Sequence, residues 1–468
     1  MQTSRRRFLY AAAGSAAFLG LARLSHAQDA GADPGAYVNE VAGYGPLVAD
    51  PAGLFDLPAG FSYRVISRAG EPMSDGLLTP DKMDGMGCFP LDSDRVVLVR
   101  NHELKLPDGD LGAFGKGRAM ASKVAADRFY DLDDSGLPMV GGTTTVIYDL
   151  RKRAIQSQHL SLVGTSTNCA GGLTPWGSWL SCEETTQVAG KGGRKDHGWV
   201  FEVPSRLKSI ADPVPLKGLG RFRHEAAVVD PRTGVVYLTE DMVDGLFYRF
   251  LPSEPGKLQA GGRLQALALP EGKDADPRNG DQAYWRQGDW RSAHWIDLDG
   301  TDNPDDDLRH RGRAAGAAVF ARGEGIFVGK GELYFACTVG GPSGHIVRYV
   351  PSPQEGRPGE ADKPGRLQLF CEPKDPKVMA MADNLAVAPW GHLFVCEDKT
   401  LGQNRLHAVT PKGQVYAFGR NAQPAAPAGT NSELAGVCFS PDGSTLFVNI
   451  YRPGVTLAIT GPWKRFRA

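Results

Sequence analysis

The sequence predicts an all-β fold, specifically a six-bladed β-propeller with long inter-blade loops. Its 468 residues include 59 glycines and 33 prolines, and few stretches have the spacing of a long helix, which favours short strands joined by tight turns. A strand-like pattern after a turn glycine also recurs along the chain. Its copies lie roughly 50 to 100 residues apart, an uneven spacing that suits blades joined by long loops.

Each copy of this pattern places a polar residue, or a cysteine, six positions after the turn glycine. The copies are Gly177 with Glu183, Gly234 with Glu240, Gly331 with Cys337, Gly391 with Glu397 and Gly443 with Asn449, and a looser copy runs from Asp92 to Glu103. Six copies predict six blades. Two β-sandwich domains are the alternative, but a sandwich gives no reason for acids to recur at corresponding strand ends. The radial sheets of a propeller do, because they direct equivalent strand ends to one central channel.

A second set of ligand-type residues lies upstream of the turn glycines. These residues are Cys169, Glu225, Glu324 and the pair Asp383-Asn384. Each stands at the start of a short apolar stretch, where an acid is costly to bury unless it is paired or bound to a metal. One segment breaks the rhythm: residues from about Pro252 to Ala318 are rich in Asp, Arg and Trp, and we expect them to form a loop excursion over one face.

The N-terminus has the pattern of a twin-arginine signal peptide over residues 1–27. Ser4-Arg5-Arg6-Arg7-Phe8-Leu9 precedes an apolar run, and Ser25-His26-Ala27 suits cleavage. We therefore expect one propeller domain over 28–468, exported in the folded state by the twin-arginine machinery to the periplasm or beyond. Since no later stretch offers about 18 consecutive apolar residues, we expect no permanent membrane association.

Eight residues form a set that could converge on the propeller axis and bind metal ions. They are Glu103, Cys169, Glu183, Glu184, Glu225, Glu240, Asp241 and Glu324. So many like charges repel one another unless cations lie between them. Carboxylates suit calcium, whereas a thiolate calls for a transition metal such as iron, so a mixed cluster would use both.

Two arginines are the predicted catalytic residues. Arg223 and Arg322 stand two positions before Glu225 and Glu324, so on a strand they share the faces of those acids. There they could meet an anion held by the metals, and phosphate is the natural candidate.

Other functions find less support in the sequence. The net charge of −1 gives no nucleic-acid signature. His102 and His224 precede Glu103 and Glu225, but neither begins the His-Glu-x-x-His of a zinc protease. The segment from Gly341 to His345 lacks the final glycine of a serine-hydrolase nucleophile elbow.

At the residues described above, the chain resembles the PhoX-type alkaline phosphatases. The matching segments are 101–103, 167–172, 174–184, 223–225, 239–241, 320–325, 383–398, 433–449 and 460–463. They cover most of the mature chain, and their order, together with the twin-arginine signal, makes the match specific.

The resemblance implies a propeller that hydrolyses small phosphate monoesters outside the cytoplasm, with an iron and calcium cluster in the channel mouth. It implies that Cys169 bridges the irons with Glu225 nearby, and that Glu103, Glu183, Glu184, Asp241 and Glu324 hold iron or calcium. Arg322 would grip the phosphate while a metal-held oxo or hydroxo group attacks phosphorus. Gly323 departs from the proline of the family's Arg-x-Glu-Gly motif, and the chain is shorter than typical members, which bears on substrate choice more than on metal binding.

Three alternatives remain open from the sequence. The same cluster could serve a phosphodiesterase or phosphotriesterase. A calcium-dependent lactonase would need one divalent metal and no thiolate, so replacing Cys169 would matter little there. In a non-catalytic binding propeller, calcium would only stabilise the fold.

Overall fold

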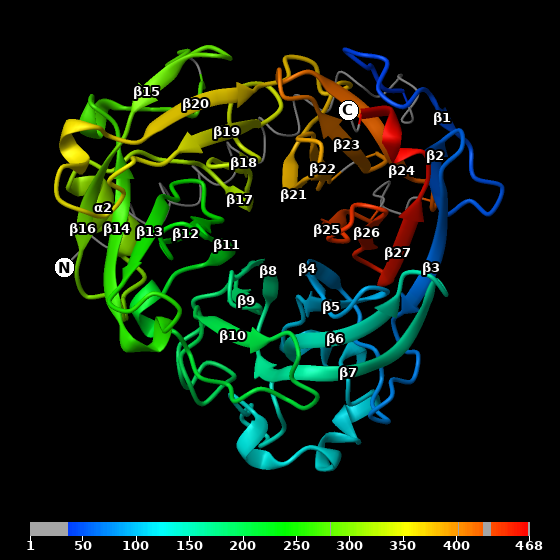
Figure 1. Ribbon diagram of the computed structural model, residues 1–468. Coiled ribbons are helices and arrows are strands. Elements are labelled where there is room, and N and C mark those ends of the chain that lie inside the picture. Colours follow the sequence, from blue (N-terminus) through cyan, green and yellow to red (C-terminus); the bar gives the residue numbers. More distant parts are fainter. Residues whose placement is uncertain (1–35, 281, 401, 425–431, 467–468) are drawn as a thin grey trace, which may run out of the picture. The chain divides into compact units, whose positions relative to one another are not determined.

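The computed structural model describes residues 36–280, 282–400, 402–424 and 432–466, so the signal peptide predicted over 1–27 lies outside the described residues. The chain from Val38 onward forms one compact unit of six antiparallel sheets. The innermost strands of these sheets are β4 (Met83–Pro90), β8 (Asn168–Leu173), β11 (His224–Val229), β17 (Gly323–Val328), β21 (Ala382–Val387) and β25 (Leu434–Phe439). Each contacts the next, and β25 contacts β4, so the sheets close a ring around one axis (Figure 1). The prediction of a six-bladed propeller is confirmed.

Each blade continues outward from its inner strand. Blade one adds β5 (Arg95–His102), β6 (Gly141–Asp149) and β7 (Ala154–Thr165), and blade two adds β9 (Ser178–Glu183) and β10 (Val200–Pro204). Blade three adds β12 (Val236–Glu240), β13 (Phe247–Pro252), β14 (Gly262–Ala268) and β16 (His294–Leu298). Blade four adds β18 (Leu333–Cys337), β19 (His345–Val350), β20 (Arg366–Cys371) and β15 (Trp290–Ser292).

Blades five and six also recruit strands from the N-terminal part of the propeller. Blade five adds β22 (Leu393–Glu397), β23 (Arg405–Val409) and β24 (Val415–Asn421), followed by β2 (Phe55–Pro58) and β1 (Leu47–Val48). Blade six adds β26 (Thr445–Ile450) and β27 (Val455–Thr460), and its outermost strand is β3 (Ser62–Arg68). Because β3 pairs with β27 from Arg68–Val455 to Ser62–Thr460, the two ends of the propeller close the ring within one sheet.

The segment 252–318 is not a loop excursion, so that expectation was wrong. It supplies β14 and β16 to the outer edge of blade three and β15 to the outer edge of blade four. It also holds the short helix α2 (Leu308–Ala314). β15 and β16 are short and only partly buried, so they give no clear strand pattern in the sequence.

Within the described residues, helical structure is confined to short pieces in loops. The connection from β5 to β6 carries η1 (Leu106–Leu111), η2 (Lys116–Arg118), η3 (Ala121–Lys123) and η4 (Ala126–Arg128). Elsewhere lie η5 (Lys217–Leu219), η6 (Leu258–Ala260), η7 (Gly272–Asp274), η8 (Glu360–Asp362) and η9 (Trp463–Phe466). In the described part of the chain, no helix has the length and apolar character needed to cross a membrane.

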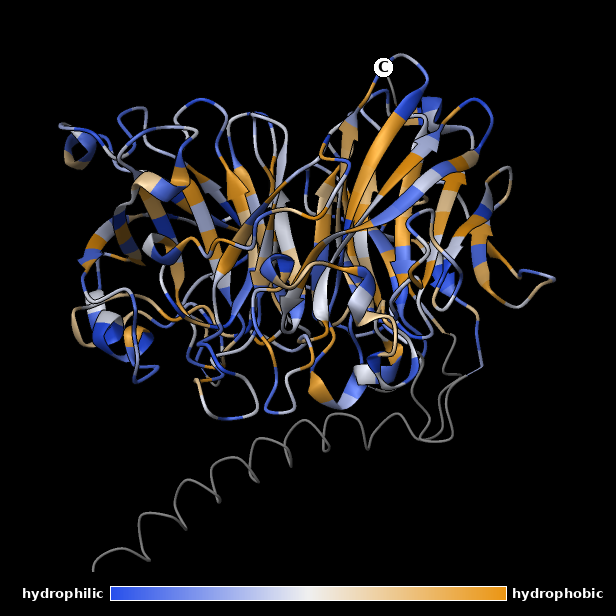
Figure 2. Cartoon of the chain, turned by 90° about the horizontal axis from the view of Figure 1, so that it is seen from below, coloured by the Kyte–Doolittle hydropathy of each residue, from blue (hydrophilic) through white to orange (hydrophobic). Residues whose placement is uncertain are grey.

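The core lies between neighbouring blades, which cover both faces of each sheet. Strands such as β12 are therefore buried at every position, and Figure 2 shows hydrophobic residues along the strands. Phe247 of blade three stacks on Phe335 of blade four with ring centroids 4.3 Å apart. At the axis the inner strands approach so closely that a Cβ on Gly85 would lie 2.5 Å from the Cα of Ala170.

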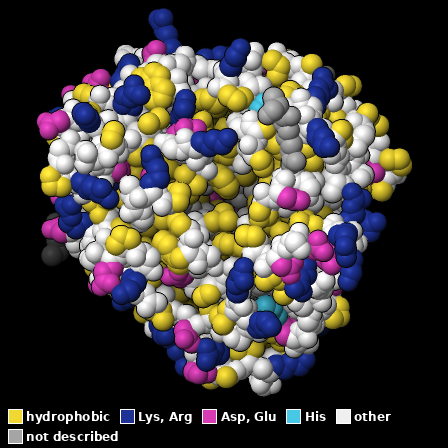
Figure 3. Space-filling model, viewed as in Figure 1, with side chains coloured by type: hydrophobic (Ala, Val, Ile, Leu, Met, Phe, Trp, Pro, Cys, Tyr) yellow, Lys and Arg dark blue, Asp and Glu magenta, His cyan; other side chains and the backbone are white. Residues whose placement is uncertain are grey.

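The axis itself is partly open. A cavity of about 180 Å³ is lined by small and apolar residues of the inner strands, including Gly85, Ala170, Ala226, Gly325 and Val437. Figure 3 shows a hollow at the centre of the face seen in Figure 1, with hydrophobic side chains around it.

Candidate metal centre

Every inner strand carries a β-bulge at the same place. In each blade, a stretch three residues long on the inner strand lies opposite a stretch two residues long on the neighbouring strand. In blade one, Met83 pairs with His102 and Met86 pairs with Arg100. A bulge adds one residue and re-aims its side chain. The first residues inside the bulges are Asp84, Cys169, Glu225, Glu324, Asp383 and Gly436. We call these the bulge positions; five of the six carry an acid or a thiol.

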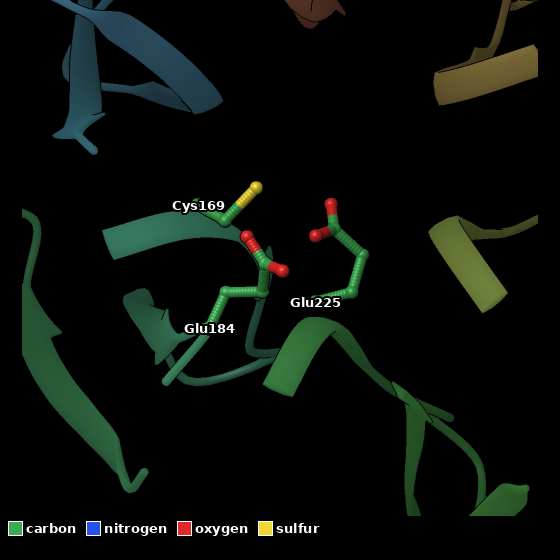
Figure 4. Close-up of side chains that lie close together, drawn as sticks. All are labelled: Cys169, Glu184 and Glu225. Atoms are coloured by element: carbon green, nitrogen blue, oxygen red, sulfur yellow. The ribbon is translucent and has the colours of Figure 1, made fainter. Parts of the chain in front are cut away.

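The bulge positions bring ligand atoms together in two groups. Cys169, Glu184 and Glu225 offer one sulfur and two carboxylate oxygens that all lie within 4.8 Å of one another. Figure 4 shows these three side chains pointing toward one another. Glu225, Glu324 and Asp383 form a second group by the same measure. Glu225 belongs to both, so the two groups form one continuous centre across blades two to five.

A second row of polar residues follows the second strand of each blade. The backbone N–H groups of Glu103, Glu184, Asp241, Thr338 and Asp398 donate to the carbonyls of Lys82, Thr167, Arg223, Arg322 and Met381, respectively. These bonds fix Glu103, Glu184, Asp241 and Asp398 beside the bulge positions. The Tyr451 hydroxyl donates to Glu103, and the Thr338 hydroxyl donates to Glu324 over 3.0 Å.

The electrostatics of this centre favour a bound cation. Burial, and then the charges of neighbouring carboxylates, raise the pKa values of Asp84, Glu225 and Glu324 well above the ordinary range. The same causes raise the pKa of Asp383 to about 8 and that of the Cys169 thiol well above its usual value. The acids therefore hold protons unless a metal replaces them.

A buried oxygen without a hydrogen-bond partner also indicates that these side chains suit metal ions. One carboxylate oxygen of Glu225, Oε1, is buried and has no hydrogen-bond partner among the described residues. A buried acceptor left without a donor costs about 1 to 3 kcal/mol, which a coordinated cation would offset. Carboxylates suit hard cations and the Cys169 thiolate suits a transition metal, so one centre offers both kinds of donor.

The two predicted arginines differ in their surroundings. The Arg322 guanidinium donates to Asp241 Oδ1 and Oδ2 over 2.8 and 3.0 Å, and one of its nitrogens lies 3.0 Å from Glu324 Oε1. Those two acids outweigh the effect of burial and raise the pKa of Arg322, so its charge is permanent. Arg223 is exposed on the neighbouring blade.

Two predicted ligands point elsewhere. Glu183 accepts hydrogen bonds from the Ser166, Gly198 and Trp199 backbone and from His197. Glu240 accepts from Leu246 N–H and the Tyr248 hydroxyl, and its other oxygen lies 3.9 Å from Arg309. With Glu397, which accepts from Ala380 and Arg405 N–H, they form a set that we call the strand-end glutamates. Their oxygens serve mainly contacts within their own blades, so their contacts give no support to a ligand role.

Comparison with known proteins identifies the family. The family model described as alkaline phosphatase PhoX matches residues 42–454. The chain belongs to the PhoX alkaline phosphatase family. No curated protein matches the chain.

Three solved structures that are similar to this PhoX family member share little sequence with it. A gluconolactonase from Xanthomonas campestris is 13% identical, with a TM-score of 0.39 over 89% of this chain and 98% of its own. A Bacteroides thetaiotaomicron protein of unknown function is 9% identical, with a TM-score of 0.41 over 85% and 76%. A putative 6-phosphogluconolactonase from Bacteroides uniformis is 10% identical, with a TM-score of 0.33 over 78% and 89%.

The PhoX-family centre contains acids that the predicted ligand set omitted. Asp84 occupies the bulge position of blade one, and Asp383 that of blade five. Asp398 lies beside Asp383 and Glu433, since its charge raises the pKa of both. A signal for Asp398 is present in the sequence: Glu397-Asp398 repeats the acid pairs Glu183-Glu184 and Glu240-Asp241.

Proposed function

We propose that this protein is an exported, metal-dependent phosphatase that hydrolyses phosphate monoesters. The observation that carries the proposal is the ring of buried carboxylates and one thiol at the bulge positions, beside Arg322, in a chain of the PhoX family. Such a ring concentrates ligands where cations can face an anionic ester.

We assign iron and calcium to the centre by ligand type. Cys169, Glu184 and Glu225 would hold iron, because this group alone includes a thiolate. Glu225, Glu324 and Asp383 would hold calcium through oxygen ligands only. When bound, these cations would supply Lewis-acid charge for the phosphoryl group and activate water for its attack.

The chain's own part is to place a fixed positive charge at the phosphoryl group. Arg322 lies against Asp241 and Glu324, so its guanidinium is already oriented at the edge of the ligand ring. A guanidinium pairs with two phosphate oxygens at once, which orients the ester as well as attracting it. Arg223, on the adjacent blade, adds a second charge at the mouth.

Metal analysis paired with an activity assay tests the proposal. Protein purified after its native export should contain iron and calcium and should hydrolyse p-nitrophenyl phosphate in a calcium-dependent manner. Bis-p-nitrophenyl phosphate serves as the diester comparison. Calcium alone, without hydrolysis of either ester, would overturn the phosphatase and favour a lactonase or a binding propeller.

We also propose export by the twin-arginine machinery, with small phosphorylated compounds as substrates outside the cytoplasm. The support is the Arg5-Arg6-Arg7 sequence and its apolar continuation. A protein with Lys at all three positions should accumulate uncleaved in the cytoplasm. Export of that variant at the normal rate would contradict the proposed route.

A further inference from the structure

Lys82 occupies, in blade one, the position that Arg322 occupies in blade four. The Lys82 carbonyl accepts from Glu103 N–H over 3.0 Å, and the Arg322 carbonyl accepts from Thr338 N–H over 3.1 Å. Both residues precede the bulge position of their strand by two. The register therefore makes them equivalent.

The backbone conformation at this position is unusual and repeated. Lys82, Thr167, Arg322 and Met381 have φ of 47°, 53°, 49° and 50°. Left-handed conformation is uncommon outside glycine and costs energy, so four copies at one register position indicate a constraint of the site. Since the same conformation sets the direction of the side chain, Lys82 and Arg322 leave the backbone in equivalent directions.

The Lys82 ammonium lies beside the proposed metal centre and forms an ion pair with one acid, Asp108, among the described residues. Its Nζ contacts Asp108 Oδ2 over 2.7 Å, and both side chains are largely buried, 10% and 15% exposed. The ammonium also lies 6.0 Å from the ring centre of Tyr451, whose hydroxyl donates to Glu103. Asp108 belongs to η1, in the loop that follows Glu103, so this ion pair stands at the edge of the centre.

Blades one and four are separated by two blades in either direction around the ring (Figure 1). Lys82 and Arg322 therefore approach the centre from opposite sides. A lysine binds phosphate as a point charge and needs no fixed fork geometry, which suits a second contact on the far side of an ester already oriented by an arginine.

We propose that Lys82 binds a phosphoryl oxygen of the substrate from the side opposite Arg322, and that Asp108 holds the ammonium until the anion arrives. This inference rests on the proposed phosphatase function. It makes Lys82 a substrate-binding residue. The Asp108 carboxylate then competes with the phosphoryl group of the substrate for the Lys82 ammonium.

Lys82→Met tests the inference, with Lys105→Met as the matched control. Lys105 carries the same charge, lies 3.7 Å from Glu103 Oε1, and is 55% exposed. Lys82→Met should raise the KM for p-nitrophenyl phosphate and the inhibition constant of inorganic phosphate at least tenfold, with iron, calcium and melting temperature unchanged. Lys105→Met should change them less than twofold, and Lys82→Arg should recover part of the affinity. Equal behaviour of the two Met variants, or loss of metal from Lys82→Met, would overturn the inference.

Asp108→Asn separates substrate binding from a structural ion pair. If Asp108 competes with phosphate, removing its charge should lower the inhibition constant of inorganic phosphate about threefold. If the pair only anchors η1, Asp108→Asn should weaken phosphate binding as Lys82→Met does, which would overturn the inference.

Calorimetric titration of the metal-loaded protein with inorganic phosphate separates this inference from the proposed function. A wild-type protein that binds phosphate but hydrolyses no ester would overturn the phosphatase alone, and the Lys82→Met affinity would still decide the role of Lys82. A wild-type protein that binds no phosphate would overturn both.

Discussion

Two sets of buried acids lie next to each other at the inner ends of the blades, and they differ in their hydrogen bonds. Glu183, a strand-end glutamate, accepts three backbone N–H groups and a histidine. Glu225, at a bulge position, keeps one buried oxygen without any partner among the described residues. Both side chains are about equally buried, 0% and 1% exposed. Burial therefore does not distinguish Glu225 from Glu183, whereas hydrogen-bond satisfaction does. The same criterion does not separate Glu240, whose Oε1 is also buried without a hydrogen-bond partner among the described residues.

The largest expected effect follows from the thiol at the bulge position of blade two. Cys169→Ser should remove iron and lower phosphatase activity by roughly 1000-fold, because a serine hydroxyl is a poor substitute for a thiolate on iron. Iron content by mass spectrometry and kcat on p-nitrophenyl phosphate measure this. Cys182→Ala, a buried cysteine of β9, is the control and should keep its iron. An iron-replete, active Cys169→Ser protein would refute the assignment.

Glu225→Gln should lower activity by roughly 100-fold and reduce bound metal, since it removes the ligand shared by both groups. The unfolding free energy of the metal-free protein should change by less than about 1 kcal/mol, because burial already favours the protonated, neutral carboxyl. Metal analysis and urea unfolding without metal check the two parts. A large loss of stability without loss of metal would place Glu225 with the structural acids.

Glu183→Gln should give the reverse result. Losing a carboxylate that accepts several buried donors should cost about 3 kcal/mol of unfolding free energy, while bound iron and calcium stay near wild-type values. The same urea and metal measurements apply. Loss of metal with unchanged stability would restore Glu183 as a ligand.

The smallest expected effect is on the pH dependence of stability. In the metal-free protein the raised pKa of Asp383, about 8, means that the folded state binds more protons than the unfolded state between pH 4 and 8. The unfolding free energy should therefore fall as pH rises through that window. The effect of Glu397 on stability has the opposite sign. Burial acts to raise the pKa of Glu397, but Lys399 and His407 lower it overall, so the stability that its carboxylate contributes is lost only in acid. Thermal unfolding at pH 4 to 8 measures the fall, and saturating calcium should abolish it.

Much of the fold could be predicted from the sequence, because the turn glycines and apolar strands repeat at each blade. The second strands begin one or two residues after a turn glycine of positive φ, as expected, at Gly177, Gly234, Gly331, Gly391 and Gly443. The segment 252–318 could not be placed, since edge strands such as β15 are short and only partly buried.

The site was predictable only in part. The positions of Cys169, Glu225 and Glu324 followed from their place before an apolar stretch, and the structure brings them together. Periodicity could not tell Glu183 from Glu184, because Glu183 is the last residue of β9 and Glu184 lies beyond the strand, where the alternation of faces no longer applies. Asp84 was missed because its blade has only the looser copy of the repeat.

The pairing of β3 with β27 has a consequence for the order of events in the cell. β3 is made early, but it lacks its partner until β27 has left the ribosome. Until that moment the ring stays open, and the side chains of blades two to five that meet at the axis lack their final spacing. The proposed metal centre can reach its finished geometry only after β27 has been made, so metal loading would follow closure of the ring rather than guide it.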